Sequence, residues 1–241
     1  MSQFPTVGSR RPNRFWVILV LLLAFGGLAI GLVSMAVRKP SNEFTRVNGI
    51  SDQQRIFGGV RQDLDRLGEP DAPVQVQVFT DVQCIECKDQ FNETIPPLVD
   101  QEVREGDVAL LFRNRSLAEN ATEIGFYGVE AAAKQGYGWQ YAYLLFQNQD
   151  EAKVQRLDKD FLTKIAQSIT HLDVAQWSKD FDEGVPKDSE MTKALEDTDK
   201  LSFDLKIRAH PAVVVNGPKG TEIVQDSPDL AEVQQAIDSV R

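Results

Sequence analysis

Cys84 and Cys87 are the only two cysteines of the chain, and their spacing is the strongest sign of chemistry in it. Two residues separate them, so one turn of helix would bring the two sulfur atoms within bonding distance of each other. A structural disulfide stabilises most when it closes a long loop, and a loop of four residues restrains the unfolded chain weakly. We therefore predict a redox-active cysteine pair, and a structural disulfide is the weaker alternative.

Strands are predicted on both sides of the cysteine pair in the sequence. Residues 74–79 alternate apolar and polar side chains after a turn-forming cluster at residues 68–73, which predicts a strand ending just before the cysteines. The apolar run at residues 108–112 is typical of a strand buried on both faces of a sheet. Residues 212–215 and 221–224, joined by a turn sequence, predict a hairpin.

The remaining elements are predicted to be helices. A helix follows Cys87, with Phe91 and Ile95 on one face, and residues 118–205 predict several further helices. A closing helix is expected after Ser227, which would be its N-cap. Aromatic side chains gather in the helical stretch: Tyr127, Tyr137, Trp139, Tyr141, Tyr143 and Phe146. Such a cluster at helical spacing indicates core packing rather than a ligand site.

The N-terminal part of the chain predicts a membrane anchor. Residues 15–37 carry no charge and are long enough to cross a bilayer, whereas the apolar region of a cleavable signal is shorter. Residues 34–36 also resemble a cleavage site, so removal of the segment is the alternative. We expect a tail at residues 1–14, a transmembrane helix at 15–37, a linker at 38–51 and one domain at 52–241.

The charge pattern bears on orientation and partners. Basic residues flank the apolar segment on both sides, so charge alone does not orient it: Arg10, Arg11, Arg14, Arg38 and Lys39. A short tail, one apolar segment and a large C-terminal domain are the layout of a signal anchor, which predicts a single-pass membrane protein with an extracytoplasmic domain. Disulfides persist on that side. The formal charge of the whole chain is −10, and its first 39 residues carry five basic and no acidic residues, so the rest of the chain is strongly acidic. Binding to nucleic acid needs a basic surface, which makes nucleic acid an unsuitable partner.

Taken together, these segments resemble the DsbA-like thiol–disulfide oxidoreductases. The resemblance runs from about Leu67 to the C-terminus, and residues 68–74, residues 79–87, the helical stretch and residues 209–217 carry it. It implies an α/β fold, namely a thioredoxin-like fold with a helical insertion at about 118–205. A single N-terminal transmembrane helix would precede this fold.

The resemblance also implies roles for individual residues. Cys84 would be the attacking thiol at the N-terminus of its helix, where the helix dipole favours the thiolate. Cys87 would resolve the mixed disulfide. Pro211 would be a cis proline beside the thiols, in a loop whose backbone pairs with an extended substrate peptide. Asp81 matches a common family residue, and we expect it to cap the thiol helix or shape its loop.

Between the cysteines the chain departs from the family, which usually has Pro first and often His or an aromatic residue second. Here Ile85 and Glu86 stand between them. A carboxylate at Glu86 near the Cys84 sulfur would repel the thiolate, and a penalty of about 1.4 kcal/mol corresponds to about 30 mV toward a more reducing potential. The alternative is a solvated Glu86 that points away.

Two further differences concern His210 and Val78. His210 precedes Pro211, where the family more often has Thr or Val, and a protonated imidazole near Cys84 would oppose Glu86; the alternative is a solvent-facing histidine. Val78 occupies a position where family members often have a buried acid. We expect no metal site, because tetrahedral zinc would need both His210 and His171 beside the cysteines, and we expect His171 at the surface.

The sequence thus predicts an enzyme that exchanges a disulfide with protein dithiols through a mixed disulfide, as a moderate oxidant and without a cofactor. Its expected partners are exported proteins with thiols or disulfides and, by analogy, a membrane quinone-linked oxidase. One alternative is a membrane-tethered reductase or isomerase supplied with electrons by a thiol relay, which Glu86 favours. An alternative of another class is a non-catalytic peptide-binding module with a structural disulfide.

Overall fold

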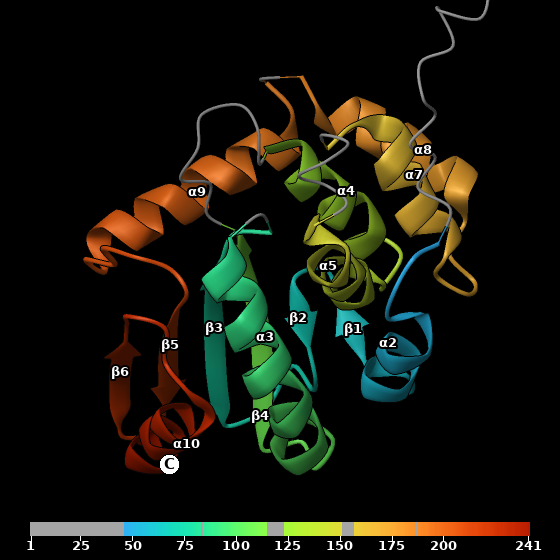
Figure 1. Ribbon diagram of the computed structural model, residues 1–241. Helices are drawn as coiled ribbons and strands as arrows, with labels where there is room; N and C mark the ends of the chain where they lie inside the picture. Colours follow the sequence, from blue (N-terminus) through green and yellow to red (C-terminus); the bar gives the residue numbers. More distant parts are fainter. Residues whose placement is uncertain (1–45, 83, 115–122, 151–156, 187) are drawn as a thin grey trace, which may run out of the picture. The chain divides into compact units, whose positions relative to one another are not determined.

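The computed structural model describes residues 46–241 except 83, 115–122, 151–156 and 187 (Figure 1). These residues belong to one compact unit, Phe44–Arg241. The tail and transmembrane helix predicted at residues 1–37 lie outside the described part of the chain. Within that part, no helix has both the length and the apolar composition needed to cross a membrane.

A six-stranded sheet forms the centre of the described unit, with strand order β1-β2-β4-β3-β5-β6. Strands β3 and β4 are parallel, and every other neighbouring pair is antiparallel. The strands are β1 (Gln62–Asp63), β2 (Arg66–Leu67), β3 (Val74–Thr80), β4 (Val108–Asn114), β5 (Ala212–Gly217) and β6 (Gly220–Val224). The four longer strands confirm the strands and the hairpin predicted from the sequence.

Helix α3 (Ile85–Leu98) makes the crossover from β3 to β4. Its side chains Cys87, Phe91 and Ile95 are buried, because positions four residues apart share one face of a helix. The helix contains Pro96 and Pro97 in its last turn and passes directly into a π-helical turn, η1 (Val99–Val103). A proline inside a helix removes a backbone hydrogen bond, which is consistent with irregular winding at this point.

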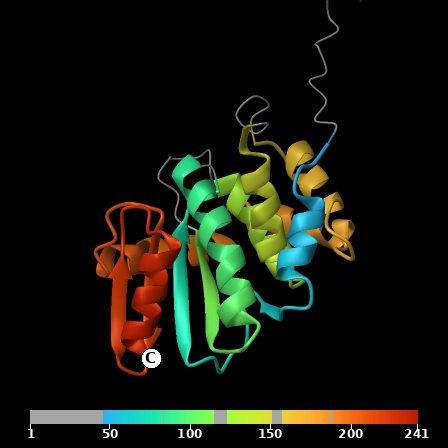
Figure 2. The ribbon, with the colours of Figure 1, turned by 60° about the horizontal axis from the view of Figure 1, so that its bottom comes forward.

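The two faces of the sheet are covered by different helices (Figures 1 and 2). Helix α3 and the closing helix α10 (Leu230–Val240) pack on one face, where Val76 and Val78 join the large core. Phe79 and Val214 point to the opposite face, since successive side chains alternate along a strand. There they pack with Ile207 and with the end of helix α9 (Glu190–Asp204).

The predicted helical insertion is confirmed, and its aromatic side chains form core. The helices between β4 and α9 are α4 (Glu123–Ala133), α5 (Gly138–Gln147), α7 (Lys159–Gln167) and α8 (Val174–Gly184). Trp139 on α5 stacks on Phe91 of α3 at 5.9 Å and meets Phe112 of β4 edge-on at 5.6 Å. Its indole N–H donates to the backbone carbonyl of Asp65. Trp139 therefore joins the helical insertion to the sheet and to the helix that carries the cysteines.

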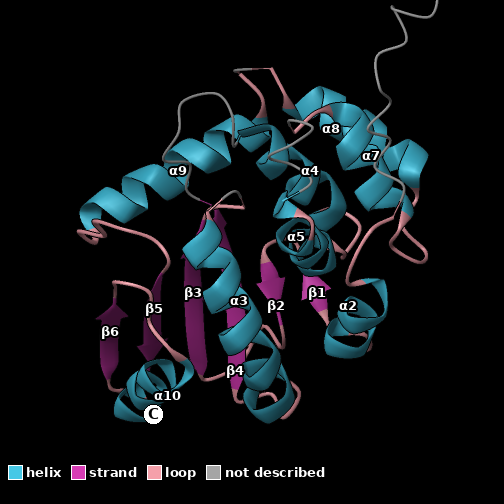
Figure 3. Cartoon of the chain, viewed as in Figure 1, coloured by secondary structure: helices cyan, strands magenta, loops and turns pink. Residues whose placement is uncertain are grey.

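Two features at the ends of the domain differ from expectation (Figure 3). Helix α2 (Ile50–Phe57) begins inside the stretch expected to be linker, and the side chain of Asn148 exchanges two hydrogen bonds with the backbone of Asn48. The predicted N-cap at Ser227 is wrong. Asp229 caps α10 instead, because it forms a reciprocal capping box with Glu232.

Candidate active site

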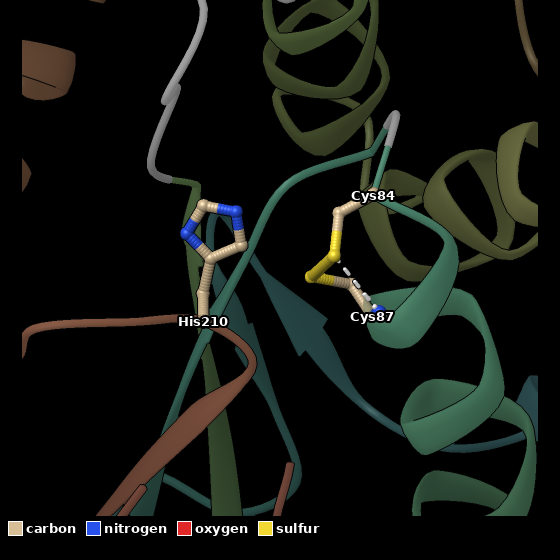
Figure 4. Close-up of side chains that lie close together, drawn as sticks. All are labelled: Cys84, Cys87 and His210. Carbon is tan, nitrogen blue, oxygen red and sulfur yellow. Dashed lines mark hydrogen bonds between the residues drawn. A yellow bond between two sulfur atoms is a disulfide. The ribbon is translucent and has the colours of Figure 1, made fainter. Parts of the chain in front are cut away.

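Cys84 and Cys87 form a disulfide at the junction of β3 and α3. Their Cα atoms are 5.1 Å apart, within the usual range for a disulfide. Figure 4 shows the two sulfur atoms at the first turn of α3, facing the loop that carries His210. The pair lies where the buried strand delivers the chain into a helix, as the sequence predicts.

Cys84 is itself the N-cap of α3. Its backbone is extended, and the backbone N–H of Cys87 donates to the Cys84 sulfur at 3.0 Å. The capping role expected of Asp81 is therefore wrong, because the Cys84 sulfur occupies the position of the capping acceptor. Asp81 instead shapes the loop: its backbone carbonyl accepts the N–H of Cys84 at 3.0 Å, and its side chain is buried.

The two sulfur atoms differ in accessibility, and a carboxylate lies beside one of them. Cys87 is 0% exposed, whereas Cys84 is half-buried and the two residues between them are exposed. A carboxylate oxygen of Glu86 lies 3.6 Å from the Cys84 sulfur. Of the two alternatives left open by the sequence, the structure therefore has the carboxylate near the sulfur rather than pointing away.

His210 and Pro211 approach the disulfide from the loop before β5. The peptide bond between them is cis, which confirms the predicted geometry. A nitrogen of His210 and the two cysteine sulfurs all lie within 4.8 Å of one another, and the imidazole faces the sulfurs (Figure 4). The expectation of a histidine close to Cys84 is thus confirmed. His171 lines a separate cavity with residues of α2 and α5.

Gln149 holds the cysteine loop and was not predicted from the sequence. It follows α5, is 2% exposed, and its side-chain amide donates to the backbone carbonyls of Val82 at 3.0 Å and Cys84 at 2.9 Å. A glutamine 65 residues after Cys84 carries no sequence signal of this contact. Val78 is buried and apolar, so it supplies no acid beneath the pair.

Comparison with known proteins gives the family. The family model described as Thioredoxin matches residues 63–239, most of the described unit. The chain belongs to the thioredoxin family. A DsbA-like arrangement within it is consistent with the helical insertion between β4 and β5.

Curated relatives carry a related name. A protein of Bacillus cereus called probable disulfide bond formation protein D is 29% identical over 180 residues, covering 71% of this chain and 76% of its own. A protein of the same name from Bacillus anthracis is 28% identical over 175 residues, with the same coverage. With the Cys84–Cys87 disulfide at the start of α3, this likeness makes the chain a thiol–disulfide oxidoreductase rather than a passive binding module.

Solved structures share the fold. Oxidised BdbD of Bacillus subtilis has a TM-score of 0.62 and 21% identity, covering 75% of this chain and 96% of that one. DsbA of Chlamydia trachomatis has a TM-score of 0.61 and 17% identity, covering 74% and 91%. At these identities the likeness supports the thioredoxin-like fold with its insertion, and the roles of single residues remain predictions.

Proposed function

We propose that the chain introduces disulfides into exported proteins, using Cys84 as the attacked sulfur and Cys87 as the leaving and resolving one. A substrate thiolate attacks the Cys84 sulfur, the disulfide opens, and Cys87 leaves as a thiolate. A second substrate thiol then attacks the mixed disulfide and releases Cys84. Two electrons and two protons pass from the substrate dithiol to the enzyme, which ends as the dithiol.

The difference in exposure between the two sulfurs is the observation that carries this proposal. Cys84 is accessible to a macromolecular thiol, whereas Cys87 is 0% exposed beneath it. The Cys84 thiolate formed on release would keep the N–H of Cys87 as a donor and would lie at the positive end of α3. The geometry thus favours attack of the substrate at the Cys84 sulfur and stabilises the Cys84 thiolate when it is released from the mixed disulfide.

The expected strength is that of a moderate oxidant. A helix N-terminus stabilises a negative charge by about 0.3–1 kcal/mol at an exposed site. The Glu86 carboxylate, 3.6 Å from the sulfur, opposes it by about 1 kcal/mol in a water-like medium. Because these contributions are of similar size, the thiolate gains little, and the disulfide is a weaker oxidant than in a protein that lacks the carboxylate.

The location and partners form a second part of the proposal. The uncharged residues 15–37 are long enough to anchor the domain, and an extracytoplasmic position would keep the disulfide available. A membrane quinone-linked oxidase would reoxidise the dithiol after each turnover. The Bacillus relatives named for disulfide bond formation support this direction of electron flow.

The reduction potential of the Cys84–Cys87 pair tests the proposal. Full-length protein would be equilibrated with glutathione buffers and its free thiols counted. We expect a value between those of a strong oxidant, about −120 mV, and thioredoxin, about −270 mV. A value of about −120 mV would contradict the proposal that the Glu86 carboxylate destabilises the Cys84 thiolate. A value near about −270 mV would favour the second candidate, a reductase or isomerase kept reduced by a thiol relay, which the position of Glu86 also supports.

A further inference from the structure

The two cysteines of the redox pair and His210 form a cluster of potential metal ligands. The sulfurs of Cys84 and Cys87 and a ring nitrogen of His210 all lie within 4.8 Å of one another. They come from two loops far apart in sequence, the start of α3 and the cis-proline loop before β5 (Figure 4). Two thiolates and an imidazole are a ligand set that Zn²⁺ favours.

The dimensions of the cluster suit such an ion. Zinc lies about 2.3 Å from sulfur and about 2.0 Å from imidazole nitrogen, so tetrahedral ligand atoms are about 3.6–3.8 Å from one another. In the oxidised protein the two sulfurs are bonded to each other, so reduction lets them separate to this spacing, and the His210 nitrogen lies no more than 4.8 Å from either sulfur. The imidazole nitrogen therefore needs to approach the sulfurs by no more than about 1.2 Å, which small rotations of the half-buried Cys84 and His210 side chains can supply once the disulfide is open.

We propose that the dithiol form of the enzyme binds one Zn²⁺ through Cys84, Cys87 and His210. Three protein ligands leave the fourth tetrahedral position open for water, as in zinc sites with an exchangeable ligand. The sequence expectation required both histidines for a zinc site. The structure brings only His210 to the cysteines among the described residues, and three ligands suffice for a site with one open position.

The acidic side chain of Glu86 beside the cluster favours a cation. Glu86 is exposed and has a carboxylate oxygen 3.6 Å from the Cys84 sulfur. The same negative charge that repels a lone thiolate attracts a divalent cation held by that thiolate. The chain carries a formal charge of −10, which does not repel cations approaching the half-buried Cys84 and His210.

Metal binding and disulfide exchange exclude each other at this site. This inference rests on the proposed function only in that turnover supplies the dithiol, by passing two electrons and two protons from a substrate to the pair. The two thiols lose their protons when zinc binds, and both sulfurs are then coordinated. The zinc-bound enzyme cannot form a mixed disulfide until the ion leaves. Zinc therefore competes with disulfide exchange for the two sulfurs of the reduced enzyme.

Titration of the full-length protein with Zn²⁺ against a chromophoric chelator, without oxygen, tests the inference. We expect one Zn²⁺ per chain in the reduced protein and at least tenfold weaker binding in the disulfide form. His210→Asn should weaken binding of the reduced protein at least tenfold. His171→Asn is the matched control, because it removes the other histidine and suits the left-handed backbone at that position, and it should leave the affinity unchanged.

Co²⁺ provides a second measurement that does not depend on affinity. The reduced protein should give the intense visible bands of tetrahedral cobalt with thiolate charge transfer, and His210→Asn and His210→Gln should both alter them. Equal zinc binding by oxidised and reduced protein, or by the His210 and His171 variants, would overturn the inference. Exchange activity measured with a chelator present separates the two proposals: active enzyme that binds no zinc leaves the proposed function intact.

Discussion

At the residue scale, the chemistry of the pair depends on two groups that act in opposite directions on one sulfur. The N–H of Cys87 points at Cys84 from 3.0 Å, and the carboxylate of Glu86 lies 3.6 Å away. The donor is fixed by the first turn of α3, whereas Glu86 is exposed and screened by salt. Substitution of Glu86 is therefore the simplest way to change the redox chemistry without changing the fold.

Glu86→Gln should raise the reduction potential, because it removes the charge that destabilises the Cys84 thiolate. For about 1 kcal/mol of relief, the rise is about 20 mV, and it should shrink at high salt. Equilibration with glutathione buffers measures it. Asp89→Asn is the control, because this acid is also exposed on α3 but lies one turn further along. An equal rise in both variants, or none in Glu86→Gln, would contradict the assigned role.

Gln149→Met should loosen the cysteine loop, because it leaves the Val82 carbonyl without its buried donor and the Cys84 carbonyl with only the backbone N–H of Lys88. Unsatisfied buried groups cost about 1–3 kcal/mol, so we expect unfolding free energy to fall by about 2 kcal/mol. The alkylation rate of reduced Cys84 should change as well. Gln147→Met is the matched control. It removes the hydrogen bond that the Gln147 amide donates to the half-buried side chain of Asn92 on α3, away from the cysteine loop, and should leave the alkylation rate unchanged.

At the element scale, the long and periodic segments could be predicted and the short ones could not. Strands β3 and β4 each have seven residues with a recognisable apolar pattern, and the hairpin has a clear turn sequence. Strands β1 and β2 have two residues each, so no pattern reveals them; β2 forms by pairing with β4, and β1 by pairing with β2. Likewise, the position of His210 beside the cysteines depends on sheet topology rather than on any local signal.

Asp229→Ala should destabilise the protein by about 1 kcal/mol, because it removes the capping box at the start of α10. Urea unfolding measures this as a lower midpoint with an unchanged slope. Ser227→Gly tests the alternative cap that the sequence suggests. Ser227 has a φ of 61°, which glycine adopts freely, so this variant should lose no stability. A larger loss at Ser227 than at Asp229 would contradict the assigned cap.

At the scale of the whole molecule, the helical insertion and the sheet enclose a second group of ionisable residues away from the cysteines. Glu130 on α4 lines a cavity of about 400 Å³ with Asp65 and Arg113, which form an ion pair with each other. Burial raises the pKa of Glu130 from 4.5 to about 7, and the Asp65 carboxylate adds to the rise, while Arg113 and Lys134 oppose it. Folding therefore makes Glu130 bind a proton more tightly.

The stability of the protein should consequently depend on pH through Glu130. Between pH 4.5 and about 7 the folded state holds a proton that the unfolded state has released, so the unfolding free energy falls as pH rises and levels off above about 7. The shift corresponds to about 3 kcal/mol as an upper bound, because the side chain keeps some contact with solvent.

Glu130→Gln should remove this dependence. The amide resembles the protonated acid, so the variant should match the parent near pH 4 and exceed its unfolding free energy by up to about 3 kcal/mol at pH 8. Urea unfolding of oxidised protein at both pH values measures the difference. Glu196→Gln, at an exposed position of α9 outside the cavity lining, should give no such gain. A Glu130→Gln variant that is destabilised equally at both pH values would show that the carboxylate is charged in the folded state and held by Arg113.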